Sequence, residues 1–266
     1  MDDILERIFA RKGERRRAAA VLEPYEKLVE RAGSRIASRR NFVAALRDAP
    51  GVAVIAEIKR ASPSAGIIAE EFDPNAIARS YQRAGADAIS VLTEEEHFLG
   101  DLRYLDEVRA ATQLPLLRKD FLASPYDIAE SAAYGADAVL LIVAGLSDHA
   151  LSDCLKEAER FSLAALVEVH DAPELERAQR LGATIIGVNN RNLHDFTIDL
   201  AVGEKLLPHL RSEAIGIAES GMRTANDVAR MLRSGARGVL VGEALMRTEE
   251  PKAFIDSLRS AAVGRL

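Results

Sequence analysis

From Val52 onward, short apolar runs rich in valine, isoleucine and leucine alternate with amphipathic stretches of helical length. This alternation predicts parallel strands joined by helices, because a parallel neighbour can be reached only by a long crossover connection. Eight runs have the length of a strand, at residues 53–58, 88–92, 115–118, 138–142, 164–167, 184–188, 215–218 and 238–241. The pattern therefore predicts an α/β fold with eight parallel strands.

The phrase Gly-Ala-x recurs before several of these runs, at Gly85, Gly135, Gly182 and Gly235. Each glycine fits the position just after a helix, where a left-handed backbone is needed. Strand ends fall roughly 21 to 34 residues apart, which suits one strand and helix per unit of a closed (β/α)8 TIM barrel. The alternative, an open doubly wound sheet, predicts a GxGxxG loop after the first strand, and the residues there read ASPS. We therefore expect the closed barrel.

Residues 1–50 precede the first strand and show helical periodicity, which predicts an N-terminal helical extension of one or two helices before a barrel domain at 51–266. The apolar positions are Ile4, Ile8 and Phe9, followed by Leu22, Tyr25, Leu28 and Val29. Two placements fit this pattern. The helices either close the N-terminal end of the barrel or lie near its active face and help to hold an anionic ligand.

Charge is unevenly distributed along the chain. The net charge is -6, yet residues 1–50 contain 12 basic and 8 acidic side chains. The overall negative charge argues against general nucleic-acid binding. The run Arg15, Arg16 and Arg17 fits either a basic patch or a solvated helix face, and the solvated face is the commoner case.

Composition narrows the class of protein. Hydrophobic residues make up 48% and charged residues 29%, as in folded soluble domains. No apolar stretch approaches the roughly 18 residues of a membrane span, and the N-terminus is charged from Asp2, so we expect a cytoplasmic protein. A single cysteine, Cys154, and five scattered histidines do not match a metal-ligand pattern, so we expect no metal.

Charged and amide side chains follow nearly every predicted strand. In a closed barrel these positions converge on one mouth, where catalytic groups lie. Burying an unpaired charge is costly, so a ring of such residues indicates function unless it is only an ion-pair network that holds the top of the barrel together. The positions are Glu57 and Lys59, Lys119 with Asp120 and Phe121, Glu168, Asn189 with Arg191, Glu219 and Glu243.

Small residues follow the last two strands. Ser220 and Gly221 come after the seventh strand and Gly242 after the eighth, which is the usual phosphate-binding corner of such barrels. Exposed backbone NH groups and helix starts near Thr224 and Ala244 favour a phosphate dianion. The residues thus indicate acid–base chemistry on a phosphorylated small molecule, with no cofactor motif.

Several segments resemble the indole-3-glycerol-phosphate synthase family, and together they span the whole barrel. They are IAEIKRASPSAG from Ile55, AISVLTEEEHFLG from Ala88, LLRKDF from Leu116, DAVLLIVAGL from Asp137, LVEVHD from Leu166, IIGVNNRNL from Ile185, AESG from Ala218 and LVGEALM from Leu240. The chain departs from the family's usual wording at Ala65, at His97 and at Gly100 with Asp101, all in predicted loops.

The resemblance implies conversion of 1-(2-carboxyphenylamino)-1-deoxyribulose 5-phosphate to indole-3-glycerol phosphate, CO2 and water, without cofactor, in tryptophan biosynthesis. Lys119 matches the family's general acid and Glu168 its general base. Lys59 matches a lysine that contacts the substrate carboxylate and assists the dehydration, with Glu57 to orient it by pairing. The remaining matches are Asn189 and Arg191 for hydroxyls and the anthranilate end, Glu219 as a polar wall, Phe121, Leu92 and Leu140 around the aromatic ring, and Ser220, Gly221, Gly242, Glu243 and Ser62 at the phosphate.

Two other functions compete with this one. A phosphoribosylanthranilate isomerase shares the phosphate corner, but it needs a cysteine on its first strand, and the only cysteine here is Cys154 in a predicted helix. A non-catalytic metabolite sensor has no need of both Lys119 and Glu168. We expect a small phosphorylated molecule as the binding partner, no nucleic acid or membrane, and a monomer in preference to a homodimer.

Overall fold

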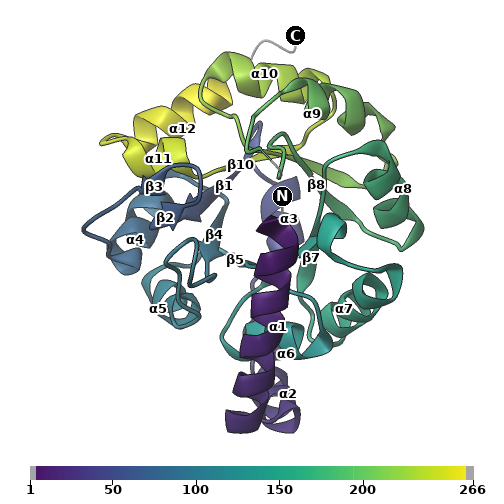
Figure 1. Cartoon of the computed structure of the whole chain (residues 1–266). Coiled ribbons are helices and arrows are strands. Elements are labelled where there is room, and N and C mark those ends of the chain that lie inside the picture. The colour runs from purple at the N-terminus through teal and green to yellow at the C-terminus, as the bar shows by residue number, and fades with distance from the viewer. Residues whose placement is uncertain (1–3, 194, 262–266) are drawn as a thin grey trace.

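The computed structural model describes residues 4–193 and 195–261. Eight parallel strands form a closed barrel in the order β1-β10-β9-β8-β7-β6-β5-β4, and helices surround it (Figure 1). This arrangement confirms the predicted (β/α)8 barrel. The strands are β1 (Ala53–Ile58), β4 (Ala88–Leu92), β5 (Leu116–Lys119), β6 (Ala138–Ile142), β7 (Ala164–Val169), β8 (Ile185–Asn189), β9 (Ile215–Glu219) and β10 (Gly238–Val241).

Four strands reach one or two residues further than the apolar runs indicated. The ladder pairs Leu92 with Lys119, and Asn189 with Glu219, and Glu168 lies inside β7 opposite Ile142. Apolar runs stop at the first polar side chain, whereas the backbone ladder is indifferent to side-chain polarity. Lys119, Glu168 and Glu219 therefore lie within strands and are fixed by the strand ladder, whereas Lys59 and Arg191 lie just beyond the ends of β1 and β8.

The outer layer consists of helices that follow the strands around the barrel. They are α4 (Pro74–Ala84), α5 (Tyr104–Ala111), α6 (Pro125–Ala133), η2 (Val143–Gly145), α7 (Asp148–Arg160), α8 (Ala172–Arg180), α9 (Ala201–Leu206), η3 (Leu207–His209), α10 (Ala225–Arg233), α11 (Glu243–Arg247) and α12 (Pro251–Ser260). A two-stranded hairpin of β2 (Ala61–Ser62) and β3 (Gly66–Ile67), which the sequence did not indicate, lies in the loop after β1. Gly85, Gly135, Gly182 and Gly235 all have positive φ, which confirms the predicted turn.

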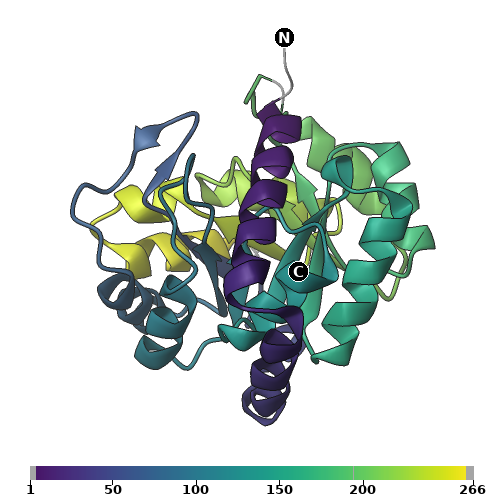
Figure 2. The same ribbon diagram turned by 60° about the horizontal axis from the view of Figure 1, so that its bottom comes forward.

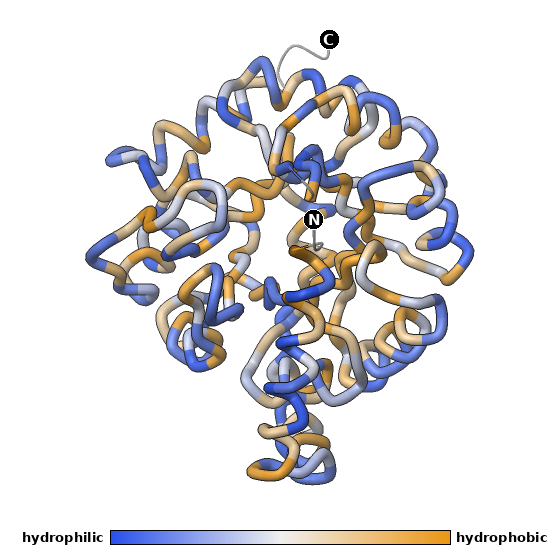
Figure 3. Tube along the Cα trace, viewed as in Figure 1, coloured by the Kyte–Doolittle hydropathy of each residue, from blue (hydrophilic) through white to orange (hydrophobic). Residues whose placement is uncertain are grey.

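Apolar side chains form two buried layers. One fills the inside of the barrel, and the other lies between the strands and the surrounding helices. Colouring by hydropathy shows the same division, with apolar strands inside and polar outer helix faces (Figure 3). None of the helices in the described part of the chain is long and apolar enough to cross a membrane.

The N-terminal extension occupies both ends of the barrel. It consists of α1 (Ile4–Leu22), α2 (Tyr25–Ser34), η1 (Ile36–Ser38) and α3 (Phe42–Arg47). Phe42 and Leu46 of α3 are buried against the inside of the barrel at its N-terminal end. The start of α1 instead lies over the opposite mouth (Figures 1 and 2). Both placements considered from the sequence therefore occur, each in a different helix.

Ion pairs hold α1 to the barrel. Lys12 contacts Asp120 at 2.9 Å, and Arg16 contacts Asp127 at 2.9 Å. Arg15 pairs with carboxylates in the loop after β4. The prediction that the arginine run is a solvated face is thus wrong for Arg15 and Arg16, because the barrel presents acidic partners that the sequence does not place nearby. The surplus positive charge of the extension is neutralised by the protein itself.

Candidate active site

A cavity of about 540 Å³ opens at the C-terminal mouth of the barrel. This volume suits a small metabolite or cofactor. All candidate residues named from the sequence line it: Glu57, Lys59, Ser62, Leu92, Lys119, Phe121, Leu140, Glu168, Asn189, Arg191, Glu219, Ser220, Gly221, Gly242 and Glu243. The strand ends therefore bring them together in one place, and their individual roles stay predictions.

Lys119 lies between two carboxylates deep in this cavity. Its Nζ is 3.3 Å from Glu168 Oε2 and 3.4 Å from Glu219 Oε2. Asn189 Nδ2 donates to Glu168 Oε1 at 3.1 Å. The ion-pair network that the sequence offered as an alternative is thus present at the top of the barrel. The network nevertheless faces a cavity, where its groups are available to a ligand.

Burial and mutual charge set the protonation of these three groups. Burial alone would lower the pKa of Lys119, but Glu168 and Glu219 more than offset it, so this pKa lies above its usual range. Burial alone would raise the pKa of Glu168, but Lys119 and His170 hold it below its usual range. Burial and the neighbouring Glu168 outweigh Lys119 at Glu219 and raise its pKa to about 8. At neutral pH the site therefore holds a charged lysine, one carboxylate and one neutral carboxylic acid.

A second ion pair faces the first from β1. Lys59 Nζ donates to Glu57 Oε1 at 2.6 Å. A Cβ atom on Gly242 would lie 2.2 Å from Glu57 Oε1 and 3.0 Å from Lys59 Nζ. The missing side chain at position 242 thus makes room for this pair at the edge of the phosphate corner.

Arg191 connects two loops over the cavity. Its backbone NH donates to Asn189 Oδ1 at 3.0 Å, and its Nη1 donates to Ser64 Oγ at 3.2 Å and to the carbonyl of Phe196. Ser64 belongs to the loop after β1, beside the small hairpin that contains Ser62. The guanidinium therefore holds the loops after β1 and β8 together at the mouth.

The predicted phosphate corner lies in a tight turn after β9. Ser220 and Gly221 both have positive φ, of 60° and 86°. A Cβ atom on Gly221 would lie 2.8 Å from the Leu200 side chain and 2.9 Å from Ile198. Just beyond, Thr224 caps α10 and forms a capping box with Asp227. The turn thus depends on glycine for its backbone and for its space.

Aromatic rings join α1 to the cavity wall. Phe121 packs edge-on against Phe9 of α1, with ring centroids 5.6 Å apart, and lies 6.2 Å from the Phe98 ring. A Cβ atom on Gly145 would lie 1.9 Å from a Phe9 ring carbon, so this glycine leaves space for the ring. Phe121 therefore both packs against its neighbours and lines the cavity.

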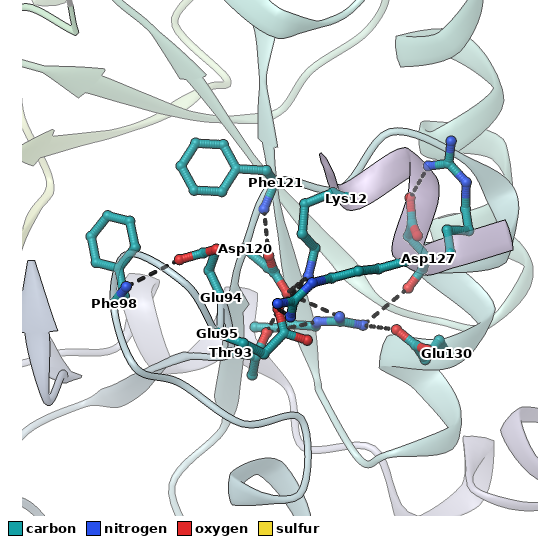
Figure 4. A network of polar contacts seen from close by, with 12 residues as sticks. Lys12, Thr93, Glu94, Glu95, Phe98, Asp120, Phe121, Asp127 and Glu130 are labelled. Carbon is teal, nitrogen blue, oxygen red and sulfur yellow. Dashed lines mark hydrogen bonds and ion pairs between the residues drawn. The ribbon is translucent and has the colours of Figure 1, made fainter. Parts of the chain in front are cut away.

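A buried polar network supports the strand that carries Lys119 (Figure 4). Asp120 Oδ2 accepts from Thr93 at 2.6 Å, from Lys12 at 2.9 Å and from Arg118 at 3.0 Å. Burial alone would raise the pKa of Asp120, but Lys12 and Arg118 lower it to about 2. The residues on both sides of Lys119 are therefore held by charged partners, one of them from α1.

Several cavity residues were not identified from the sequence. They are apolar residues of α1 and of the loops, together with two arginines near the phosphate corner: Ile4, Leu5, Ile8, Phe98, Leu193, Phe196, Ile198, Met222, Arg223 and Arg247. Arg223 follows Gly221 by two residues, so a basic residue close to that turn was the available signal. The α1 residues gave none, because periodicity does not say where a helix docks.

Metal ligands were also sought in the structure. Among residues 4–193 and 195–261, no group of three or more histidine, cysteine or carboxylate side chains is arranged to hold a metal ion. Cys154 is buried in α7, away from the residues that line the cavity.

Comparison with known proteins shows the family of this chain. The family model for indole-3-glycerol phosphate synthase matches residues 5–258. The indole-3-glycerol phosphate synthase of Chromobacterium violaceum is 46% identical over 261 residues, covering 97% of this chain and 98% of the relative. That of Roseiflexus castenholzii is 48% identical over 254 residues, covering 92% and 94%.

A solved 3-hexulose-6-phosphate synthase superposes with a TM-score of 0.62 at 17% identity, covering 79% of this chain and 99% of that chain, which concerns the fold alone. The family model and the sequence relatives go further than the fold. By both, this chain belongs to the indole-3-glycerol phosphate synthase family.

Proposed function

We propose that this chain converts 1-(2-carboxyphenylamino)-1-deoxyribulose 5-phosphate to indole-3-glycerol phosphate, CO2 and water, as a carboxy-lyase of tryptophan biosynthesis. One observation carries the proposal beyond family membership: a lysine lies between two buried carboxyl groups in the cavity, 3.3 Å from Glu168 and 3.4 Å from Glu219. Mass spectrometry after incubation with this substrate tests it. The mass of the product must be lower than that of the substrate by one CO2 and one water.

Ring closure requires a proton donor. The aromatic carbon that bears the carboxylate attacks the ribulose carbonyl, and the carbonyl oxygen must gain a proton as the carbon–carbon bond forms. Lys119 is charged at neutral pH and is available as this general acid. Loss of CO2 then restores the aromatic ring.

Dehydration requires a base. The base removes a proton from the ring carbon next to nitrogen, and the carbon–oxygen bond at the neighbouring ring carbon breaks. The departing hydroxyl takes up a proton, for which Lys59 beside Glu57 is the donor we propose, and leaves as water. Glu168 is ionised, is oriented by Asn189 and lies next to Lys119, so it is the base we propose. Acid and base thus lie on β5 and β7, which are separated by the single strand β6.

The remaining side chains position the substrate. Lys59, paired with Glu57, suits the substrate carboxylate, and Arg191 suits the anthranilate end. Phe121 with Leu92 and Leu140 offers an apolar wall for the aromatic ring, and α1 covers it. Excluding water at this wall strengthens the charged interactions around the reacting atoms.

The phosphate corner yields a prediction with an internal control. We expect Gly221→Asp to raise KM by about tenfold or more over Gly221→Ala, because both variants carry the strained Cβ and only aspartate repels phosphate. Steady-state kinetics of both variants measures the difference. Equal KM values for the two variants would mean that the phosphate does not bind at this corner.

The raised pKa of Glu219 predicts a pH dependence. Above a pH of about 8 this acid ionises and adds negative charge to a site for a substrate with a carboxylate and a phosphate. We expect kcat/KM to fall about tenfold per pH unit above that point and expect Glu219→Gln to remove the fall, since kcat/KM reports groups of the free enzyme. Profiles of both proteins across this range measure it. The same alkaline limb in both would assign the titration to another group.

The two rival functions fit the structure less well. The isomerase needs a cysteine as acid or base in its active site, whereas Cys154 is buried in α7. A metabolite sensor does not account for a lysine held between two carboxyl groups at the reacting end of the cavity. We propose action in the cytoplasm, where amino-acid precursors are made, on a small phosphorylated substrate by a monomer, with a homodimer as the alternative.

A further inference from the structure

Two buried carboxyl groups flank Lys119 almost equally. Glu168 lies 3.3 Å from Lys119 Nζ and Glu219 lies 3.4 Å from it, and each side chain is 2% exposed. Distance and burial therefore do not decide which of the two is the ionised base. The difference must come from the other neighbours of each carboxyl group.

Glu168 has a cationic neighbour that Glu219 lacks. His170 follows β7, and its buried Nε2 lies 3.2 Å from Glu168 Oε1, as an ion pair and not a well-aligned hydrogen bond. On the other side of the ring, Nδ1 lies 3.1 Å from Glu174 Oε2, which also accepts from the His170 backbone NH at 2.7 Å. The imidazole is thus held between two carboxylates, one in the cavity and one in the first turn of α8.

Glu219 has the opposite surroundings. Its Oε1 is buried and has no hydrogen-bond partner among the residues that the structure describes. A Cβ atom on Gly187 would lie 2.0 Å from this oxygen, so the oxygen rests against bare backbone. An ionised oxygen there would be uncompensated, which favours the neutral acid.

We propose that His170 is a positioning residue that makes Glu168, and not Glu219, the ionised carboxylate beside Lys119; this inference rests on the proposed function. Neither His170 nor Glu174 is among the residues that line the cavity, so the effect passes through Glu168. The charged or polar groups that face Glu168 are Lys119 from β5, Asn189 from β8, Glu219 from β9 and His170, with Glu57 of β1 acting on Lys119.

The electrostatics of the imidazole agree with this role. Burial alone would lower the pKa of His170, but Glu168 and Glu174 outweigh it and raise this pKa to about 10. The ring is therefore an imidazolium at neutral pH, and both of its nitrogens carry protons. The two carboxyl groups beside Lys119 hold one proton between them, and a cation beside Glu168 keeps that proton on Glu219. Glu168 is then ionised and can accept a proton from the substrate.

A double-mutant cycle tests the inference. His170→Gln keeps an NH donor and removes the charge, so the shared proton moves toward Glu168 and kcat/KM falls about tenfold or more, since one pKa unit is a factor of ten. In a Glu219→Gln background the competing acid is absent. There the same His170→Gln change should cost about threefold or less, because Glu168 no longer competes for a proton.

A purely structural histidine would behave differently. If His170→Gln lowers kcat/KM by the same factor in both backgrounds, the inference is overturned. His149→Gln is the matched control, because this histidine lies on α7 with a side chain that is 89% exposed, and it should leave kcat/KM unchanged. A wild-type chain that forms no indole product overturns the proposed function itself, which is a separate result from equal factors in an active enzyme.

A second variant keeps the test open if His170→Gln does not fold. Glu174→Gln retains an acceptor for the His170 backbone NH and removes the outer carboxylate, so the pKa of His170 must fall. We expect activity close to wild type at low pH and a progressive loss as pH rises through the lowered pKa. A loss of equal size at every pH would contradict the inference.

Discussion

Replacing Lys119 with methionine is expected to lower kcat by about two to four orders of magnitude, the usual contribution of a positioned general acid. Methionine keeps the unbranched apolar stem, and Glu219 is already neutral beside it, so the fold should persist. Without the proton, the carbonyl oxygen cannot be neutralised as the ring closes. CO2 and indole should therefore both appear at the same, greatly reduced rate. Near-normal turnover would remove Lys119 as the acid.

Lys119→Arg separates proton donation from charge. Arginine keeps a cation between Glu168 and Glu219 but gives up its proton far less readily than lysine. We expect this variant to unfold at a temperature close to that of the wild type and still to lose most of its turnover. Thermal unfolding and steady-state rates measure the two properties. An active arginine variant would mean that Lys119 acts only by its charge.

Replacing Glu168 with glutamine should produce an equally large loss of kcat at a different step. The amide oxygen still accepts from Asn189, so KM should change little. Ring closure and CO2 loss remain possible in a single turnover, because Lys119 is intact, whereas dehydration lacks its base. Quenched-flow measurement of CO2 and of indole should therefore show CO2 ahead of indole. Parallel loss of both products would place Glu168 at ring closure instead.

The barrel was predictable from the sequence because it rests on repetition. An apolar run marks each strand, and a glycine with positive φ, such as Gly85 or Gly135, marks several of the turns from helix to strand. The residues at strand ends were predictable for the same reason. Closing the barrel necessarily brings Lys119, Glu168 and Glu219 to one mouth.

The features that the sequence did not indicate depend on contacts between distant segments. The docking of α1 depends on Phe9 fitting over Gly145 and on Lys12 meeting Asp120, two pairings more than a hundred residues apart. Helical periodicity defines an apolar face but not its partner. Likewise, the sequence does not indicate a role for His170, because only the packing of β7 and α8 places it between Glu168 and Glu174.

The most direct test of the central claim uses the absence of tryptophan from this chain, which leaves tyrosine as the main background for indole fluorescence. Purified protein is mixed with 1-(2-carboxyphenylamino)-1-deoxyribulose 5-phosphate, and indole emission is followed over time, with Lys119→Met as the control. The account predicts a rise over many turnovers with the wild type and a rise at least about a hundredfold slower with the variant. Tight binding of the substrate without any rise would contradict it and would favour a metabolite sensor.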